Sequence, residues 1–208
     1  PVFAKVRARA KQTTCLNNEK QIGLAILMYA NEYDDQLPTV AYYKNDPNYG
    51  QVLIAWDELV FKYVQTQNRA IWICPANDIT EERRLPVQPY WGRGYGLNYY
   101  DYPSSNIQAG LKIANIPNVA GTIMLAEIAN INHHGIHFYR GWQVDPNTGG
   151  PPVDSGGAQW SNLYYNVHNG KSNYLFFDGH AKLLEYRQTV DSSLGGTGDR
   201  NMWRRDLP

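Results

Sequence analysis

The sequence predicts an α+β fold in which one long N-terminal helix packs on an antiparallel β-sheet with long loops. Three segments carry this prediction. Residues 4–33 have apolar side chains at helical spacing, and residues 121–128 form a short apolar run that follows turn residues. Residues 173–184 hold an apolar run, an Asp-Gly pair and an alternating run. Separate helical and strand periodicities of this kind are typical of an α+β domain.

The N-terminal segment is expected to be one continuous helix whose two halves differ. No proline lies between Val2 and Leu37. The first half, residues 1–15, has no acid and carries four cations within seven residues, namely Lys5, Arg7, Arg9 and Lys11. The second half, residues 16–35, has an apolar face made of Ile22, Ala25, Ile26, Tyr29 and Tyr33.

These halves predict different surroundings. At about 1.5 Å per residue the helix is roughly 45 Å long, more than a domain of this size needs. We therefore expect residues 1–15 to be a stalk that contacts other molecules through its cations. Residues 16–35 should pack under a globular domain of residues 36–208. Asp34 and Asp35 should end the helix.

The middle of the chain predicts short elements joined by loops. Residues 39–51 are rich in Tyr, Asn and Pro and are expected to form a loop. Helical spacing over 54–65 predicts a short second helix, and the apolar residues 70–74 before a proline predict a short strand. We expect further strands within 95–102 and 133–142, a central strand at 121–128, and a surface loop at 146–157.

The strongest local signal is the hairpin at residues 173–184. An Asp-Gly pair between two strand-like runs favours a tight turn, because glycine adopts positive φ without strain. We expect Asp178 and Gly179 to form a two-residue turn.

Composition restricts the classes of function. The 208 residues suit one domain with an appendage, and the formal net charge of +0 does not favour nucleic-acid binding. Sixteen Tyr, six Trp and 18 Gly are typical of extracellular domains. No stretch has the length and apolarity of a membrane span or matches a signal peptide.

Two cysteines, Cys15 and Cys74, permit one intramolecular pairing. A disulfide between them would connect the helix to the strand expected at 70–74, which suits a secreted protein. The alternative is two buried thiols.

Three segments resemble a known bacterial family. They are residues 15–34, residues 72–75, and His168 followed by nine residues and then Asp178-Gly179. Together they are similar to the prepilin-type proteins with a processing-associated H-x9-DG domain, which are relatives of type II secretion pseudopilins. The resemblance implies a pilin-like fold, a membrane anchor upstream of Pro1, and export to the cell envelope or the extracellular space.

The sequence offers two candidate metals, zinc and calcium. The five histidines match no zinc motif, so a zinc site is not favoured. Major pseudopilins carry calcium in a C-terminal loop, so the resemblance makes calcium the candidate cofactor. Its oxygen donors would be Asp191, Ser193, Asp199 and Asp206. For His168, a hydrogen bond to backbone groups across the sheet that fixes the strand register is favoured over a ligand role.

We therefore expect a non-enzymatic structural subunit that self-associates through its N-terminal helix, with no nucleic-acid partner. The alternative is an envelope-anchored binding module that holds a glycan on aromatic loops. The candidate aromatic residues are Tyr90, Trp91, Tyr99, Tyr100, Trp142 and Trp160. A metal-dependent hydrolase is a third hypothesis, although no nucleophile elbow and no Cys-His pair stands out.

Overall fold

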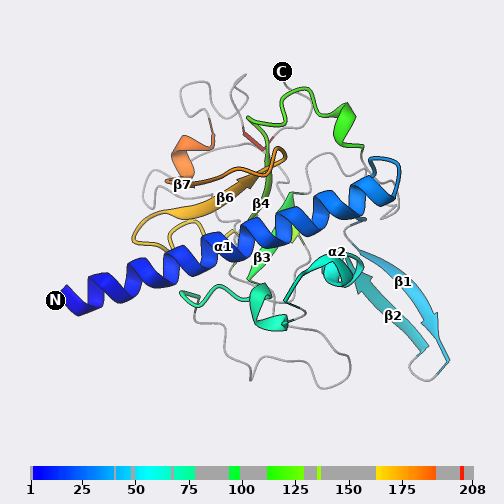
Figure 1. Cartoon of the computed structure of the whole chain (residues 1–208), viewed down its shortest axis with the longest axis horizontal. Helices are drawn as coiled ribbons and strands as arrows, with labels where there is room; N and C mark the ends of the chain where they lie inside the picture. The colour runs from blue at the N-terminus through cyan, green and yellow to red at the C-terminus, as the bar shows by residue number, and fades with distance from the viewer. Residues whose placement is uncertain are drawn as a thin grey trace, which may run out of the picture.

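The computed structural model describes residues 2–39, 41–47, 50–66, 68–77, 94–98, 112–128, 135–136, 163–190 and 202–203. One helix, α1 (Val2–Glu32), runs across a five-stranded sheet, and a separate two-stranded hairpin lies near the end of the molecule opposite the N-terminus (Figure 1). The expected α+β arrangement, with a long N-terminal helix on a largely antiparallel sheet, is confirmed.

The main sheet has the strand order β5-β3-β4-β6-β7. Its strands are β3 (Tyr95–Asn98), β4 (Ile123–Glu127), β5 (Gly135–Ile136), β6 (Ser172–Phe176) and β7 (Ala181–Leu184). Neighbouring pairs are antiparallel except β3 and β5, which are parallel. The segment 121–128 thus supplies the central strand, as predicted, and its five strand residues are all buried.

The two faces of the sheet bury separate apolar clusters. The α1 side contains Ile22 and Ile26 of the helix together with Leu125 and Leu175 of the sheet. The opposite side is closed by Tyr174, Phe176, Tyr186 and Trp203, among others. Burial on both faces explains why the residues of β4 form an apolar run and do not alternate between apolar and polar side chains.

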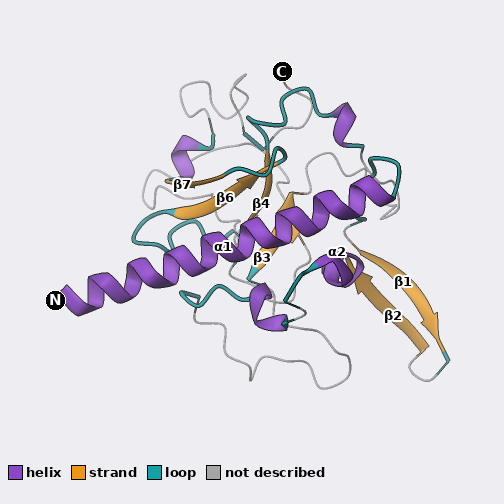
Figure 2. Cartoon of the chain, viewed as in Figure 1, coloured by secondary structure: helices purple, strands orange, loops and turns teal. Residues whose placement is uncertain are grey.

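The helix α1 changes its surroundings along its length. Residues 2–11 are exposed, and Cys15 is the first buried residue. The buried face then continues through Glu19, Ile22, Gly23, Ala25, Ile26 and Ala30. The exposed first half extends beyond the sheet, as Figure 2 shows. Within the described residues, no helix has both the length and the apolarity needed to cross a membrane.

The helix ends at two residues with left-handed backbone conformation. Asp34 and Asp35 have φ values of +52° and +66°. The Asp35 amide donates a hydrogen bond to the Ala30 carbonyl at 2.9 Å, which closes the last turn. The Asp35 carboxylate accepts one from the Ala114 amide at 2.8 Å, so this turn also fixes a distant segment.

The hairpin β6–β7 is confirmed, but its turn is longer than predicted. Phe176 and His180 are the last pair joined by a backbone hydrogen bond, at 2.9 Å, so three residues connect the strands. Gly179 has φ +87° in a connection of this length, which suits the left-handed position of a three-residue loop. Its α-carbon faces Leu27 of α1, since a Cβ placed there would lie 3.6 Å from the Leu27 Cδ1.

Three other sequence predictions are wrong. Residues 39–51 are not a loop but contain β1 (Ala41–Asp46), which pairs with β2 (Gly50–Ala55). Its Asn and Pro residues gather at the connection, while Tyr42, Tyr43 and Val52 favour strands.

The predicted second helix is shorter than 54–65. It comprises α2 (Trp56–Val60) and one 3-10 turn, Phe61–Tyr63. The strand predicted at 70–74 is a 3-10 helix, Arg69–Trp72. The Asn68 side chain caps this helix by accepting a hydrogen bond from the Ala70 amide at 2.9 Å.

Candidate functional site

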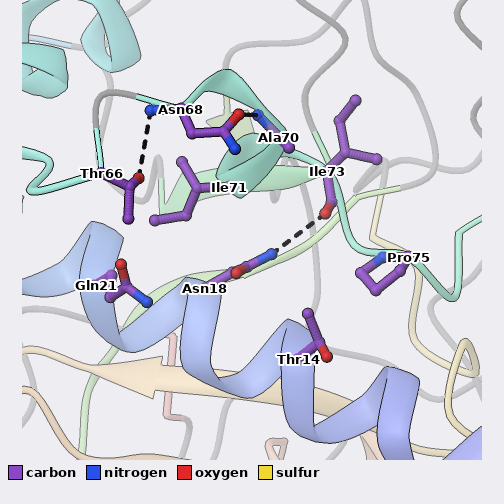
Figure 3. Close-up of a pocket in the computed structure, with 9 residues that line it drawn as sticks. All are labelled: Thr14, Asn18, Gln21, Thr66, Asn68, Ala70, Ile71, Ile73 and Pro75. Carbon is purple, nitrogen blue, oxygen red and sulfur yellow. Dashed lines mark hydrogen bonds between the residues drawn. The ribbon is translucent and has the colours of Figure 1, made fainter.

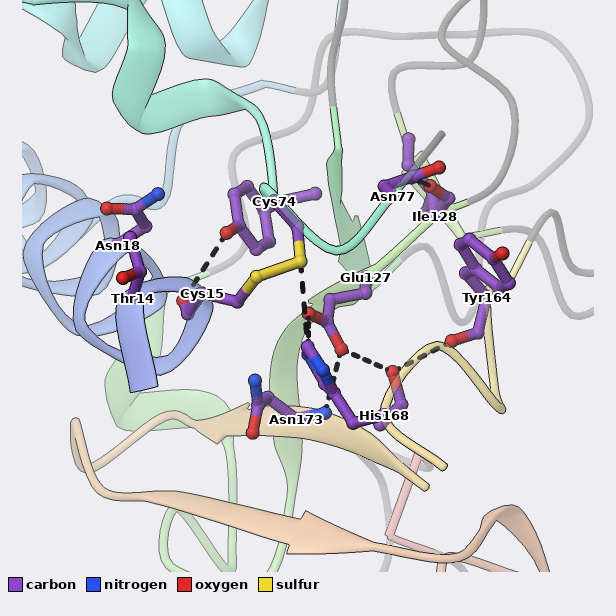
Figure 4. Close-up of polar contacts among 12 residues, drawn as sticks. Thr14, Cys15, Asn18, Cys74, Asn77, Glu127, Ile128, Tyr164, His168 and Asn173 are labelled. Atoms are coloured by element: carbon purple, nitrogen blue, oxygen red, sulfur yellow. Dashed lines mark hydrogen bonds and ion pairs between the residues drawn. A yellow bond between two sulfur atoms is a disulfide. The ribbon is translucent and has the colours of Figure 1, made fainter. Parts of the chain in front are cut away.

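The centre of the candidate site is a buried disulfide between α1 and the loop that follows the 3-10 helix. Cys15 and Cys74 are bonded, their Cα atoms lie 4.9 Å apart, and both are inaccessible to solvent. Figure 4 shows the disulfide next to the sheet, where Glu127 and His168 approach it. The bond therefore links the helix to the globular body, although Cys74 does not belong to a strand.

Glu127 and His168 form a buried pair beside the disulfide. The His168 Nε2–H donates to Glu127 Oε1 at 2.7 Å, and the two side chains are 3% and 0% exposed. Glu127 is the last residue of β4, and His168 belongs to the turn that leads into β6. A backbone hydrogen bond from His168 to the Lys171 carbonyl, at 2.8 Å, closes this turn.

The second oxygen of Glu127 is also held. Its Oε2 accepts a hydrogen bond from the Asn173 amide at 2.9 Å and lies 2.6 Å from Ser172 Oγ. The Ser172 hydroxyl also lies 2.8 Å from the Tyr164 carbonyl, and it donates its single proton to one of the two acceptors at a time. Both carboxylate oxygens of Glu127 are thus held by hydrogen bonds, and Oε1 lies on the side of the disulfide.

The histidine also reaches the disulfide. The distance from His168 Nε2 to Cys74 Sγ is 3.8 Å. One ligand atom from each of Cys15, Cys74, Glu127 and His168 lies within 4.8 Å of the other three. No local pattern in the sequence indicates this proximity, because the two residues are 94 positions apart and meet only through the fold.

A further carboxyl group lies on the same buried helix face. Glu19 follows Cys15 by one turn of α1, is 0% exposed, and has no hydrogen-bond partner for either oxygen. Burial raises the pKa of Glu19 well above its usual value, and the nearby Glu127 carboxylate raises it further. The buried site thus favours the protonated form of Glu19 over its charged form.

Two neighbouring residues belong to this buried environment. Tyr95 donates a hydrogen bond to the Cys15 carbonyl at 3.3 Å. Burial raises the pKa of Tyr95 well above its usual value, and Glu19 and Glu127 raise it further. The side-chain amide of Asn173 is buried without a partner. One turn after Glu19, Gly23 packs over Leu175 of β6.

The H-x9-DG residues do not form one site. His168 was expected to hydrogen-bond backbone groups across the sheet, but its ring is bonded to the Glu127 carboxylate. The Glu127 carboxylate takes the place of the expected backbone acceptor, because Glu127 is the last residue of β4 and lies beside the turn that contains His168. Asp178 lies at the hairpin tip, where its Oδ1 accepts hydrogen bonds from the His180 amide at 3.1 Å and from the His180 ring at 2.5 Å.

The other predicted sites have different outcomes. The cations Lys5, Arg7, Arg9 and Lys11 are all exposed on the first half of α1. The calcium ligands proposed at Asp191, Ser193, Asp199 and Asp206 lie outside the described residues, as do the six candidate glycan-binding aromatic residues and His133, His134 and His137.

A surface groove runs along α1 beside the disulfide. It has a volume of about 430 Å³ and lies between the helix and the segment 66–75 (Figure 3). Asn18 points from α1 across the groove and donates to the Ile73 carbonyl at 3.3 Å. The remaining lining is polar on the helix, from Thr14 and Gln21, and apolar at Ile71 and Pro75.

Sequence reasoning missed Glu19, Glu127, Ser172 and Asn173. Two of them carried a signal. Glu19 is a carboxyl residue four positions after Cys15 on the face that the helical pattern buries, and Glu127 ends an otherwise apolar strand. A charged residue at such a position needs a buried partner. Comparison of the chain with protein families, curated proteins and solved structures gives no match.

Proposed function

We propose that this protein is a non-enzymatic, pilin-like structural subunit that assembles into an extracellular or envelope-attached filament through α1. The observation that carries the proposal is the exposure of the first half of that helix. Val2, Phe3 and Val6 are 70%, 88% and 59% exposed. A short helical segment with no packing partner is marginal in water, so this half gains stability from a partner.

The exposed half has a defined chemical pattern. At 100° per residue, Phe3, Val6 and Ala10 fall on one narrow stripe, and Lys5, Arg7, Arg9 and Lys11 lie to both sides of it. A surface that complements this pattern is apolar in its centre and acidic at its edges.

The second half of the same helix has such a surface. Leu24 and Met28 are 51% and 44% exposed on its solvent side. Together with Leu27 and Tyr63 they line a hollow of about 500 Å³ that also includes Glu32, whose carboxylate is paired with Lys62 at 3.0 Å. Asp34 is exposed just beyond the helix end. The two halves of α1 thus carry complementary apolar and charged features.

Contact of the first half of one copy with the second half of the next, made in one direction only, is heterologous. A heterologous contact that does not close into a ring repeats as an open filament. The resemblance of residues 15–34, 72–75 and 168–179 to prepilin-type proteins supports the same function. The disulfide supports it as well, because it fixes the helix to the body and would carry force between them.

The test is self-association of the full chain at low ionic strength, followed by light scattering and negative-stain electron microscopy. The double variant K5E/R9E reverses two stalk cations, and K44E/R187E makes the same change in net charge at exposed residues outside α1. We expect wild type and K44E/R187E to assemble and K5E/R9E to remain monomeric. Equal behaviour of all three proteins would refute the assembly role.

The alternative is an extracellular module that binds a glycan. The groove beside α1 favours glycan binding, because Asn18, Gln21 and Thr14 present amide and hydroxyl groups near an apolar floor. This function predicts a monomer whose tryptophan fluorescence changes on titration with oligosaccharides. A chain that assembles and does not respond to sugars contradicts it.

A further inference from the structure

We propose that Cys15, Cys74, Glu127 and His168 form a tetrahedral zinc site when the disulfide is reduced. The same four side chains then have two states: a covalent cross-link in the oxidised chain and a metal centre in the reduced chain. This inference does not depend on the proposed assembly function.

The positions of the four ligand atoms fit a zinc ion. With Zn–S bonds of about 2.3 Å and Zn–N or Zn–O bonds of about 2.0 Å, the ligand atoms of a tetrahedral site lie roughly 3.3–3.8 Å apart. His168 Nε2 is already 3.8 Å from Cys74 Sγ. The four ligand atoms lie within 4.8 Å of one another, so only small side-chain rotations are needed. After reduction, the two sulfur atoms separate and the His168–Glu127 hydrogen bond opens to admit the ion.

The chemistry of the four donors suits zinc. Two thiolates, one imidazole and one carboxylate are all common zinc ligands, and together they provide the closed four-coordinate set of a structural site. Hard cations such as calcium prefer six to eight oxygen ligands and would not be satisfied here. The site is also dry, since His168 is 8% exposed and the other three residues are fully buried.

The surrounding groups orient two of the ligands. Glu127 Oε2 is held by Ser172 and the Asn173 amide, which leaves Oε1 directed to the ion. Glu19, one helical turn after Cys15, has no partner for its buried carboxyl group. This carboxyl group lies on the same buried face of α1 as Cys15. Outer groups of this kind support metal ligands in proteins.

The change of state balances as a two-electron reduction. A dithiol reductant supplies two electrons and two protons, the S–S bond breaks to give two thiols, and the reductant becomes a disulfide. Zinc then displaces both thiol protons to solvent. His168 binds through Nε2 and carries its remaining proton on Nδ1.

The experiment compares refolding of the full chain in two redox states. Because the site is buried, the protein is unfolded and then refolded with or without one equivalent of zinc. Reduction uses a trialkylphosphine, which is oxidised to its phosphine oxide and competes less for zinc than a dithiol. Metal content is measured after gel filtration, and cobalt is substituted to detect thiolate charge-transfer bands and tetrahedral d–d bands.

We expect one zinc per chain in the reduced protein, none in the oxidised protein, and a higher midpoint of thermal unfolding for the zinc-loaded form. H168Q and C74S should lose tight binding. H180Q, which changes a partly exposed histidine at the hairpin tip, should bind zinc like the wild type.

Two results would overturn the proposal: a reduced chain that folds but binds no zinc, or zinc binding that is equal in the oxidised chain or in H168Q. If the reduced chain does not fold without metal, folding on addition of zinc supports the site. Failure to fold with zinc counts against it.

Discussion

The sharpest stability prediction concerns the disulfide. Substituting both cysteines in C15A/C74A removes the disulfide cross-link between α1 and the body. The sequence separation is 59 residues. With the loop-entropy relation ΔS ≈ −2.1 − 1.5R ln n, this gives roughly 14 cal/mol/K, or about 4 kcal/mol at 25 °C. The free energy of unfolding should fall by that amount.

The assay is urea unfolding followed by circular dichroism, with a chelator present so that metal binding does not contribute. Wild type reduced by a phosphine is the matched control and should lose a similar free energy. The slope of the free energy against urea should rise, because the unfolded chain without the cross-link is less compact and exposes more surface. A loss below about 1 kcal/mol in both proteins would refute the view that the disulfide anchors the helix.

Three further predictions follow from buried residues of α1 and β4. E127A should lower the free energy of unfolding by about 3 kcal/mol, because it breaks a buried pair. E127Q should lower it by less, because its amide oxygen still accepts hydrogen bonds. The midpoints of urea unfolding measure both effects. The raised pKa of Glu19 means that the folded chain binds more protons than the unfolded chain above about pH 4.5, its ordinary value. The free energy of unfolding should therefore fall as the pH rises above that value. E19Q should remove this fall, so that it is more stable than wild type at pH 8 and equally stable near pH 4. Unfolding measured across pH would contradict this if the stability curves of the two proteins stay parallel. G23A places a Cβ 2.3 Å from Leu175 Cδ2 and should destabilise by about 1 kcal/mol after its gain in helix propensity, whereas N17A on the exposed face should stabilise slightly.

The parts of the fold that followed from the sequence depend on local signals. α1 has an uninterrupted helical pattern, and the β6–β7 hairpin has a glycine at its turn. β4 was predictable because burial on both faces gives a continuous apolar run. The hairpin β1–β2 was missed because the Asn and Pro residues at its connection suggested a loop, although its backbone pairs over Ala41–Asp46 and Gly50–Ala55.

The site was only partly predictable. Two cysteines allow one pairing, so the disulfide was a direct hypothesis. Its polar partners depend on strand register: Ala126 pairs with Tyr174, which puts Glu127 next to Asn173. A bulge between Ile123 and Leu125 shifts this register, and no local pattern in the sequence specifies it. The position of His168 beside the sulfur follows from the same pairing.

The measurement that tests the central claim most directly is site-specific photo-cross-linking of the intact chain. A photoreactive phenylalanine analogue replaces Phe3, the most exposed large apolar residue on the helix. The account predicts cross-links between chains that mass spectrometry maps to residues 24–35 of a second copy, and few from the same analogue placed at Lys44, which is exposed in β1. Cross-links that occur only within one chain, or at equal yield from both positions, would contradict assembly through α1.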